Sequence, residues 1–420
     1  MNKMHPLYFK GAFFMILFIS DCIFTSSASY KESFSGYIVV KDGIIEEINE
    51  GSPSIELKNS ADEVIDARGK TILPGFVDSH THLVHGGSRE NELAMKLKGA
   101  SYMELHKVGG IGATVKATRK ATEAELYNKA FSTLDNMLLH GVTTVEAKSG
   151  YGLDLETEIK CLKVNRKLNE THPIDLISTY MGAHSTPPEF VGNTDGYIDF
   201  MIKEVMPKVK SEGLAEFCDA FCEEGIFSLE QTEKVLKAAK DMGFKLKLHA
   251  DEIVPFNGAE LAAKMGSVSA EHLMAVSDNG IKAMAQSGTV AVLLPATSFF
   301  LMSKVYAPAK KMLSEGVKVA ISTDYNPGSS PTENIQMAMW VACFKMGLTP
   351  QEIIRGVCIN ASYAVTREKT IGSLEKGKNA DIVIFNSPSI EYIMYRFGSN
   401  LVSQVWKNGR LVVKDGKLIY

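Results

Sequence analysis

The amino-acid sequence predicts an α/β fold, a (β/α)8 TIM-type barrel with a small β-sandwich domain built from both termini. Three observations lead to this prediction. Apolar, β-rich runs alternate with helical patterns through the middle of the chain. Eight such runs can be counted, which is the number of strands in a barrel of this type. Similar strand–turn–strand patterns stand near both ends, at residues 35–48 and 405–420.

Each expected barrel strand is a short run rich in β-branched or aromatic residues. The eight runs are Ile72–His80, Thr143–Lys148, Leu176–His184, Phe217–Phe221, Lys245–His249, Val268–His272, Val290–Leu294 and Val317–Thr323. Helical patterns lie between them, for example over 121–141 and 228–243. A doubly wound open sheet is the alternative fold. No GxGxxG motif follows the first strand, which weakens a dinucleotide-binding interpretation.

The two ends of the chain are expected to form the smaller domain together. "MILFISDCIFTSS" and "GYIVVKDGIIEEI" read as paired strands, with Lys41-Asp42-Gly43 as the hairpin turn. Residues 376–385 add another strand. We therefore predict a composite β-domain from residues 15–70 and 372–420, and a barrel domain from residues 71–371.

Residues 1–14 are predicted to be an N-terminal extension. A secretory signal peptide is the less favoured interpretation, because Asp21 interrupts the apolar run. No run reaches the roughly 18 apolar residues of a membrane span. We therefore expect a cytoplasmic protein that has no membrane partner.

Composition excludes several classes of partner. The net charge of −4 gives no electrostatic footprint for nucleic acid or an anionic membrane. The 6 cysteines are widely spread and do not resemble a disulfide framework. Apolar barrel helices would allow a homodimer.

Histidines and acids gather at the expected strand ends, where barrels of this kind place their catalytic groups. Five of the 10 histidines stand there. The strand-end residues are His80, His82, His184, His249, Glu252, His272 and Asp324. We interpret the histidines His85, His106, His140 and His172 as ordinary surface or core residues, because none is in phase at a strand end.

Three imidazoles and one carboxylate, from His80, His82, His249 and Asp324, suit Zn²⁺ or Fe²⁺. One ion is expected, because the fourth strand, "AEFCDAFCEEG", lacks a lysine that could bridge two. A bound ion lowers the pKa of water from about 15.7 towards 7. Glu252 could carry the water's proton, and His272 with Asp324 could orient the water or stabilise an oxyanion.

These motifs resemble the mononuclear branch of the amidohydrolase superfamily. Within it, the resemblance is to the imidazolonepropionase family of histidine degradation. The blocks that carry it are "HTHLVHGGSRE", "KSGYGL", "MGAHSTPPE", "LHADE" and "STDYNPGSSPTENIQ". The second and last blocks are the most specific, since HxH is shared by many hydrolases.

The resemblance implies metal-dependent hydrolysis of 4-imidazolone-5-propanoate, a small molecule, to N-formimidoyl-L-glutamate. It implies metal ligands at His80, His82, His249 and Asp324, and acid/base roles for Glu252 and His272. Arg89 would hold the substrate carboxylate, as a bidentate guanidinium can. The other implied substrate-binding residues are Tyr102, Tyr151, His184, Glu252, Asn326, Gly328 and Ser329.

The chain departs from the family pattern in places. Its glycine run, "VGGIGATVKATR" at 108–119, is shorter than the family's, and the shortened Gly109–Gly112 loop could alter substrate fit. His85 stands where the family often has an aromatic residue. A related deaminase or another cyclic amidase is therefore the alternative function. A metal-holding protein without catalysis is disfavoured, because both Glu252 and His272 are present.

Overall fold

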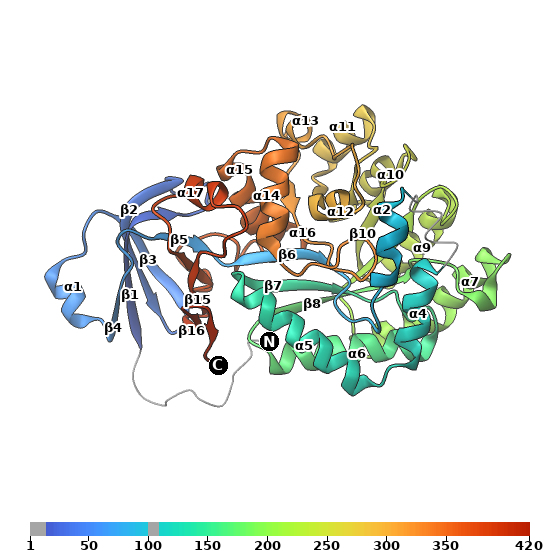
Figure 1. The fold of residues 1–420 in the computed structure, drawn as a ribbon, viewed down its shortest axis with the longest axis horizontal. Helices are drawn as coiled ribbons and strands as arrows, with labels where there is room; N and C mark the ends of the chain where they lie inside the picture. Colours follow the sequence, from blue (N-terminus) through green and yellow to red (C-terminus); the bar gives the residue numbers. More distant parts are fainter. Residues whose placement is uncertain (1–13, 100–108) are drawn as a thin grey trace.

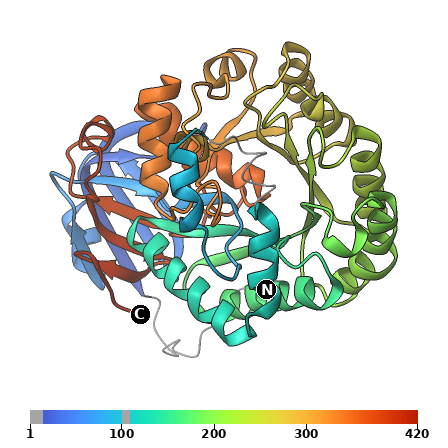
Figure 2. The ribbon, with the colours of Figure 1, turned by 45° about the vertical axis from the view of Figure 1, so that its right-hand side comes forward.

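The computed structural model describes residues 14–99 and 109–420 of the chain. Eight parallel strands form the predicted barrel and follow one another in chain order. They are β6 (Phe76–Thr81), β7 (Val142–Lys148), β8 (Asp175–Ala183), β9 (Phe217–Cys222), β10 (Lys245–Ala250), β11 (Ser269–His272), β12 (Val290–Leu293) and β13 (Val319–Ile321). Figure 2 shows the helices arranged around these strands. The prediction of an eight-stranded barrel is confirmed.

Backbone hydrogen bonds join the first and last strands at the carboxyl end of the barrel. The N–H of Asp324 donates to the carbonyl of His80 at 3.1 Å, and the N–H of His82 donates to the carbonyl of Tyr325 at 2.8 Å. Thr81 and Tyr325 form a parallel bridge at the same place. These bonds set the His-Thr-His segment directly beside Asp324.

Helices fill the connections between the strands. Those of the barrel are α2 (Leu93–Leu97), α4 (Gly110–Lys120), α5 (Glu123–Leu139), α6 (Leu155–Thr171), α7 (Thr194–Phe200), α8 (Met206–Ser211), α9 (Leu229–Asp241), α10 (Gly258–Met265), α11 (Asp278–Ser287), α12 (Pro295–Phe300), α13 (Ala309–Ser314), α14 (Ile335–Met346), α15 (Pro350–Arg355) and α16 (Ala361–Ala364). The helices expected over 121–141 and 228–243 are confirmed as α5 and α9. Each begins with a capping box, Thr122 with Glu125 and Ser228 with Gln231, which satisfies two backbone donors of the first turn.

Strands from both ends of the chain form one mixed sheet beside the barrel (Figure 1). Its strands are β1 (Met15–Phe24), β2 (Ser33–Lys41), β3 (Ile44–Glu50), β4 (Glu63–Asp66), β5 (Thr71–Pro74), β14 (Ile382–Phe385), β15 (Val402–Lys407), β16 (Arg410–Lys414) and β17 (Lys417–Leu418), with the short helices α1 (Ile55–Ser60) and α17 (Ile390–Tyr395) alongside. β5 pairs with β1 on one side and with β14 on the other, so it joins the two ends. The predicted hairpin turn is present, with Asp42 and Gly43 at φ of 50° and 81°. The predicted small β-domain from both termini is confirmed.

The first expected strand, Ile72–His80, is divided in two by the structure. β5 ends at Pro74 and belongs to the terminal sheet, whereas β6 begins at Phe76 and belongs to the barrel. A Cβ on Gly75 between them would come within 2.3 Å of Thr143 Oγ1, so the chain passes very close to β7 there. Every residue of both halves is buried, and the apolar run Ile72–Leu73 continues across Pro74-Gly75 into Phe76–Val77, which is why the sequence pattern merged them. The Pro-Gly pair is the breaker that separates them.

A buried lysine of the terminal sheet, Lys407, forms an ion pair with the barrel. Lys407 of β15 lies 2.8 Å from Asp175 Oδ2 at the start of β8 and 2.6 Å from Asp381 Oδ2. Within the sheet, Phe18 and Trp406 pack edge to face with ring centroids 5.1 Å apart. The pair of Lys407 with Asp175 lies at the amino end of β8, away from the carboxyl ends of the barrel strands.

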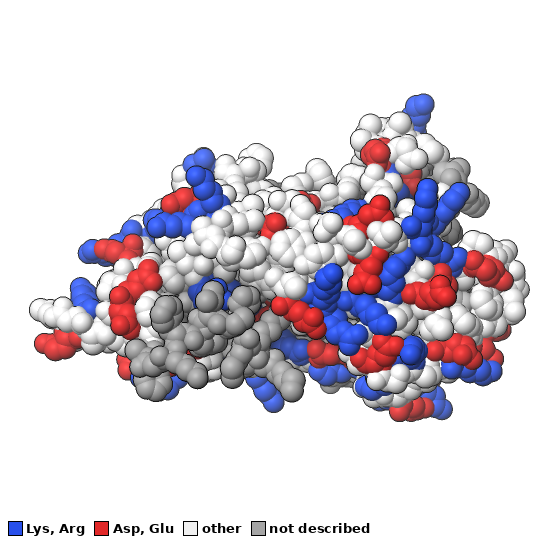
Figure 3. Space-filling model, turned by 90° about the horizontal axis from the view of Figure 1, so that it is seen from below, with Lys and Arg blue, Asp and Glu red and all other residues white. Residues whose placement is uncertain are grey.

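The surface carries both signs of charge. Figure 3 shows one face, on which basic and acidic side chains are interspersed. No helix among the described residues is long and apolar enough to cross a membrane.

Candidate active site

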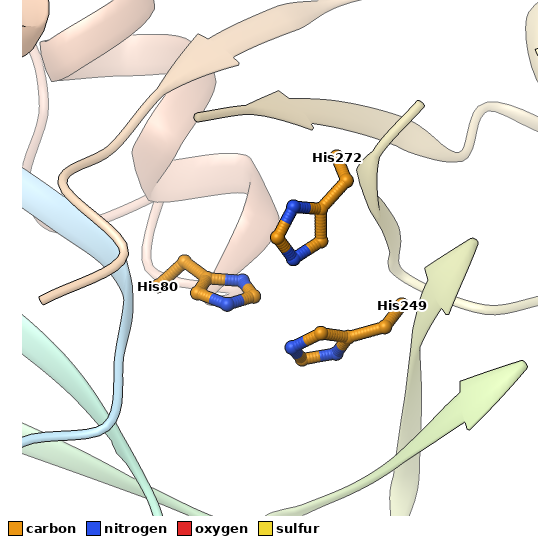
Figure 4. Close-up of side chains that lie close together, drawn as sticks. All are labelled: His80, His249 and His272. Carbon is orange, nitrogen blue, oxygen red and sulfur yellow. The ribbon is translucent and has the colours of Figure 1, made fainter. Parts of the chain in front are cut away.

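Four histidines and two carboxylates meet at the carboxyl ends of the barrel strands. They are His80 and His82 of β6, His249 of β10, Glu252 after it, His272 of β11 and Asp324 after β13. Nε2 of His80 and of His82 lie 3.3 Å and 3.7 Å from Oδ1 of Asp324. The ring centroid of His249 lies 4.6 Å from that of His80 and 5.1 Å from that of His272, and Figure 4 shows these three rings around a common space. The structure brings together all four residues predicted to bind metal.

Two further carboxylates orient two of these imidazoles from behind. Oε2 of Glu271 lies 2.7 Å from Nδ1 of His80, and Oδ2 of Asp219 lies 3.0 Å from Nδ1 of His249. The contact with Glu271 is a hydrogen bond and leaves Nε2 of His80 as the nitrogen that faces the site, whereas the contact with Asp219 places a carboxylate beside His249 without hydrogen-bond geometry. Carboxylates that fix the tautomer of a histidine in this way are typical of metal centres.

The cluster fits a divalent metal ion. Nε2 of His80, Nδ1 of His82 and both ring nitrogens of His249 are buried and have no hydrogen-bond partner among the described residues. The ligand atoms of His80, His82 and Asp324 lie within 4.8 Å of one another, as do those of His80, His249 and His272. An unpaired buried nitrogen costs about 1–3 kcal/mol, which coordination would remove. Imidazole nitrogens with one carboxylate are ligands that divalent transition metals accept.

Two buried lysines balance the carboxylates behind the site. Nζ of Lys148 lies 2.8 Å from Oδ2 of Asp219 and 2.9 Å from Oε1 of Glu146. Burial raises the pKa of Asp219, but His249 and Lys148 outweigh it and hold that pKa well below its usual value. Lys247 donates to Ser269 Oγ at 3.1 Å and lies 3.6 Å from Glu271. The acids behind the imidazoles are therefore paired with cations rather than left as isolated buried charges.

Glu223 holds Glu252 at the pocket through backbone hydrogen bonds. The N–H groups of Glu252 and Ile253 donate to Oε2 of Glu223 at 3.1 Å and 2.8 Å. Oε2 of Glu252 lies 3.6 Å from Nε2 of His272. Burial raises the pKa of Glu252 well above its usual value, and the charges of Asp324 and Glu223 add to the rise. A buried carboxyl group whose pKa is raised by its surroundings is a candidate for proton transfer.

Backbone geometry at His272 and Asp324 is unusual. Both lie in the left-handed region, with φ of 68° and 53°, which non-glycine residues adopt mainly where function or packing requires it. Thr297 Oγ1 donates to Oδ2 of Asp324 at 2.7 Å. Burial raises the pKa of Asp324 to about 7, while the bond from Thr297 opposes the rise. Of the two carboxylate oxygens of Asp324, Oδ1 is the one that faces His80 and His82.

Most of the predicted substrate-binding residues line the same pocket. They are Arg89, Tyr151, His184, Asn326 and Ser329, beside His82, His249, Glu252, His272 and Asp324. Gly328 lies against Arg89, since a Cβ there would come within 2.1 Å of Nη1. Tyr102 lies outside the described residues. Ile111 and Phe221 also line the pocket, and Ile111 stands in the first turn of α4 within the glycine run.

The loop that carries Tyr151 is built around a buried carboxylate. Oε1 of Glu158 accepts the N–H groups of Gly150, Gly152 and Leu153 at 2.8–3.2 Å. Gly150 adopts φ of 112°, and a Cβ there would come within 2.7 Å of the Met181 carbonyl. Nδ1 of His184 lies 3.0 Å from the Gly150 carbonyl. The tyrosine and the histidine are therefore positioned by one shared turn.

Asn326 organises the loop after β13. Its Oδ1 accepts the N–H groups of Gly328 and Ser329 at 2.8 Å each, and its Nδ2 donates to the carbonyl of Asp324 at 2.7 Å. This turn holds the loop that contacts Arg89.

Sequence reasoning missed the supporting acids. Asp219 and Glu271 stand inside buried strands, and Glu158 stands on the inner side of α6. An acid within an apolar strand is itself a signal, because a buried carboxylate needs a partner. The four histidines interpreted as non-ligands are His85, His106, His140 and His172. His106 lies outside the described residues, and the other three are not part of the cluster around Asp324 in the described structure.

Comparison with known proteins agrees with this geometry. The model of the amidohydrolase family matches residues 71–412. The chain is 65% identical over 411 residues to imidazolonepropionase of Treponema denticola, covering 97% of this chain and 100% of that one. It is 54% identical to imidazolonepropionase of Alkaliphilus metalliredigens, covering 91% and 92%.

Solved structures share the fold at low sequence identity. Atrazine chlorohydrolase of Arthrobacter aurescens, complexed with zinc, is 18% identical, with a TM-score of 0.72 over 96% of each chain. An adenosine deaminase of Xanthomonas campestris with bound zinc is 16% identical, with a TM-score of 0.70 over 96% of this chain and 94% of that one. At this identity the likeness bears on the fold alone.

Proposed function

The chain belongs to the amidohydrolase family together with its imidazolonepropionase relatives, and from this premise we propose that its barrel pocket hydrolyses the ring of 4-imidazolone-5-propanoate. It is a hydrolase of cyclic carbon–nitrogen bonds in histidine degradation, with N-formimidoyl-L-glutamate as product. The observation that best supports the assignment of roles is that Arg89 lines the pocket in which the histidine cluster and Glu252 meet.

The proposed metal ligands are His80, His82, His249 and Asp324. A divalent ion held there supplies Lewis acidity, which lowers the pKa of water and polarises a carbonyl group. Zinc and iron both suit three imidazoles and a carboxylate, and either is part of the proposal. We propose a single ion, because β9 offers no lysine at the position of a bridging ligand.

Glu252 moves the proton in the proposed reaction. Its carboxylate takes a proton from the attacking water as the water oxygen adds to the ring carbonyl carbon. It then delivers that proton to the ring nitrogen as the carbon–nitrogen bond breaks. Burial raises its pKa well above the usual value, which favours holding the proton between the two transfers.

The remaining residues bind and orient the substrate. His272, 3.6 Å from Glu252, is placed to orient the water or the developing oxyanion, and Asp324 flanks the same space. Arg89 binds the propanoate carboxylate as a charged fork. Tyr151 and His184 contact the ring, and Asn326, Gly328 and Ser329 form the loop at the carboxylate end. Tyr102 is proposed as a further contact.

Cytoplasmic location and a homodimer complete the proposal. All six cysteines are free thiols, as is usual in a reducing compartment. Phe344 and Phe397 are exposed and pack edge to face with centroids 5.8 Å apart, which leaves an aromatic pair available to a second copy. Light scattering of the purified protein would measure the mass of the assembly.

The test is hydrolysis of freshly generated 4-imidazolone-5-propanoate by the purified protein. Loss of the substrate's ultraviolet absorbance would be followed together with the metal content of the same sample. We expect fast, metal-dependent loss that yields N-formimidoyl-L-glutamate. Absence of turnover by metal-loaded protein would contradict the proposed substrate.

A further inference from the structure

A compact group of three buried charges lies behind the carboxylate end of the pocket. Arg89, Glu92 and Lys96 are 8%, 5% and 4% exposed. They stand on the turn Glu90–Glu92 and helix α2, spaced so that they share one side of it. Leu93 and Leu97 on the same segment are exposed at 45% and 68%. This short segment therefore turns its charges inward and its leucines outward, the reverse of an ordinary surface helix.

Glu92 fixes the guanidinium of Arg89. Nε of Arg89 lies 2.7 Å from Oε1 of Glu92, and Nη2 lies 2.8 Å from Oε2. This two-bond contact sets the plane of the guanidinium as well as its place. Arg89 is among the described residues that line the pocket, and Glu92 is not, so Glu92 acts on the pocket through Arg89.

Lys96 contacts the loop after β13, and that loop in turn lies against Arg89. Its Nζ donates to the carbonyl oxygen of Gly328, whose Cα lies against Nη1 of Arg89. The same Nζ lies 4.4 Å above the ring of Phe300. A carbonyl oxygen and an aromatic face are both partners of an ammonium group. Burial and Arg89 lower the pKa of Lys96, and Glu92 raises it, so the three groups share one electrostatic environment.

The formal charges of this group do not cancel. Within these three side chains, Arg89 and Lys96 carry two positive charges and Glu92 carries one negative charge, a formal sum of one positive charge. An Arg89–Glu92 pair alone would present hydrogen-bond donors but no net charge to a ligand. A buried surplus charge is costly until a counter-ion arrives. One substrate carboxylate would bring the group to neutrality.

We propose that Lys96 is a specificity-determining residue that supplies the surplus positive charge of the carboxylate subsite, while Glu92 positions Arg89 within it. The ligand is a compound with a single carboxylate at the end of a short chain. The identity of that ligand rests on the proposed function. Lys96 acts on the ligand through its charge and on the pocket loop through its bond to the Gly328 carbonyl. It is therefore a positioning and specificity residue and takes no part in the chemical step.

A purely structural role for Lys96 predicts something different. If its ammonium served only to hold the Gly328 carbonyl, its loss would disturb the loop for every ligand alike. A charge-supplying role instead weakens only ligands that carry a carboxylate. Two probes of nearly equal shape, imidazolepropanoate and imidazolepropanamide, separate the two roles.

The experiment measures binding of both probes to the metal-loaded protein by titration calorimetry, which needs no turnover. Wild type should bind the propanoate more tightly. Lys96→Met keeps the apolar stem over Phe300 and should weaken the propanoate about tenfold, roughly the loss of one charged partner, while the amide changes less than about twofold. Lys96→Arg should restore most of the preference. Lys98→Met, which removes an exposed lysine from the end of the same helix, is the matched control.

Equal weakening of both probes by Lys96→Met, or an unchanged preference for the propanoate, would overturn the proposal. Equal binding of both probes by wild type would also overturn it. If wild type prefers the propanoate and Lys96→Met abolishes the preference, but no 4-imidazolone-5-propanoate is hydrolysed, the proposed function fails while the inference about Lys96 stands.

Discussion

Asp219 contacts His249 twice, once at its backbone and once at its ring. Oδ1 of Asp219 accepts the N–H of His249 at 3.2 Å, and Oδ2 lies 3.0 Å from Nδ1 of the imidazole. The first contact is a hydrogen bond between the neighbouring strands β9 and β10, and the second brings a carboxylate charge beside the imidazole. One carboxylate therefore holds the backbone of this histidine and also stands behind its ring, where the carboxylate partner of a metal-binding histidine stands.

Asp219→Asn is expected to weaken metal binding by about 10–100-fold, as loss of a histidine's carboxylate partner typically does. The same change leaves Lys148 with less compensation, because Asp219 is one of its two close acids. Competition with a chelator of known affinity would measure the effect. Asp241→Asn, at an exposed helix end, is the control. Wild-type metal affinity in Asp219→Asn would rule out this role.

Glu252→Gln should retain metal and lose most turnover. The amide keeps the shape of the carboxylate but cannot carry the proton, which we expect to cost about 10²–10⁴-fold in kcat. Metal content and kcat would be measured on the same preparation. Glu224→Gln, an exposed neighbour of Glu223, should behave as wild type. Activity within a few-fold of wild type would show that Glu252 is not the proton carrier.

Arg89→Ala should mainly raise KM. The guanidinium is proposed to bind the substrate carboxylate equally in the ground and transition states, so its loss removes binding energy rather than catalysis. Steady-state kinetics over a wide range of substrate concentration would separate the two parameters. An unchanged KM would remove Arg89 from the carboxylate subsite.

Gly328→Ala tests the same subsite without touching a charge. The added Cβ would lie 2.1 Å from Nη1 of Arg89, so the guanidinium has to move. We expect a higher KM with folding retained, because the obstacle is one side chain at the pocket wall. Wild-type kinetics in Gly328→Ala would mean that the position of Arg89 does not matter.

His85 should make the protein sensitive to mild acid. Burial and then Lys129 lower its pKa to about 3, and the contact of Nδ1 with the His82 carbonyl only partly opposes this. The unfolded chain takes up this proton below about pH 6.5, whereas the folded chain does not, so stability falls as the pH falls from 6.5 towards 3. At pH 5 the loss from this one group is about 2 kcal/mol.

His85→Phe would remove this contribution while keeping a buried ring. The free energy of unfolding, from denaturant titrations at pH 7.5 and pH 5, should therefore decline less in the variant than in wild type. Equal declines in the two proteins would show that His85 does not carry the acid sensitivity.

Local sequence patterns were sufficient for much of the fold. The helices α5 and α9 and strands such as β8 and β10 stand where their residue patterns predict them. The same patterns failed at Pro74-Gly75, where two buried strands of different sheets follow one another. Periodicity reports which residues are apolar, but it does not report which sheet a strand joins.

The candidate site likewise has one part that local sequence predicts and one part that it does not. The sequence by itself determined the histidines and acids at strand ends, because the spacing of His80 and His82 and the strand-end positions of His249 and Asp324 are local features. Only the tertiary structure decided that Asp219 and Glu271 support the imidazoles, and that Lys96 reaches Arg89 across Gly328. The physical reason is that such pairings depend on strand register and loop packing between segments far apart in the chain, which no short stretch of sequence contains.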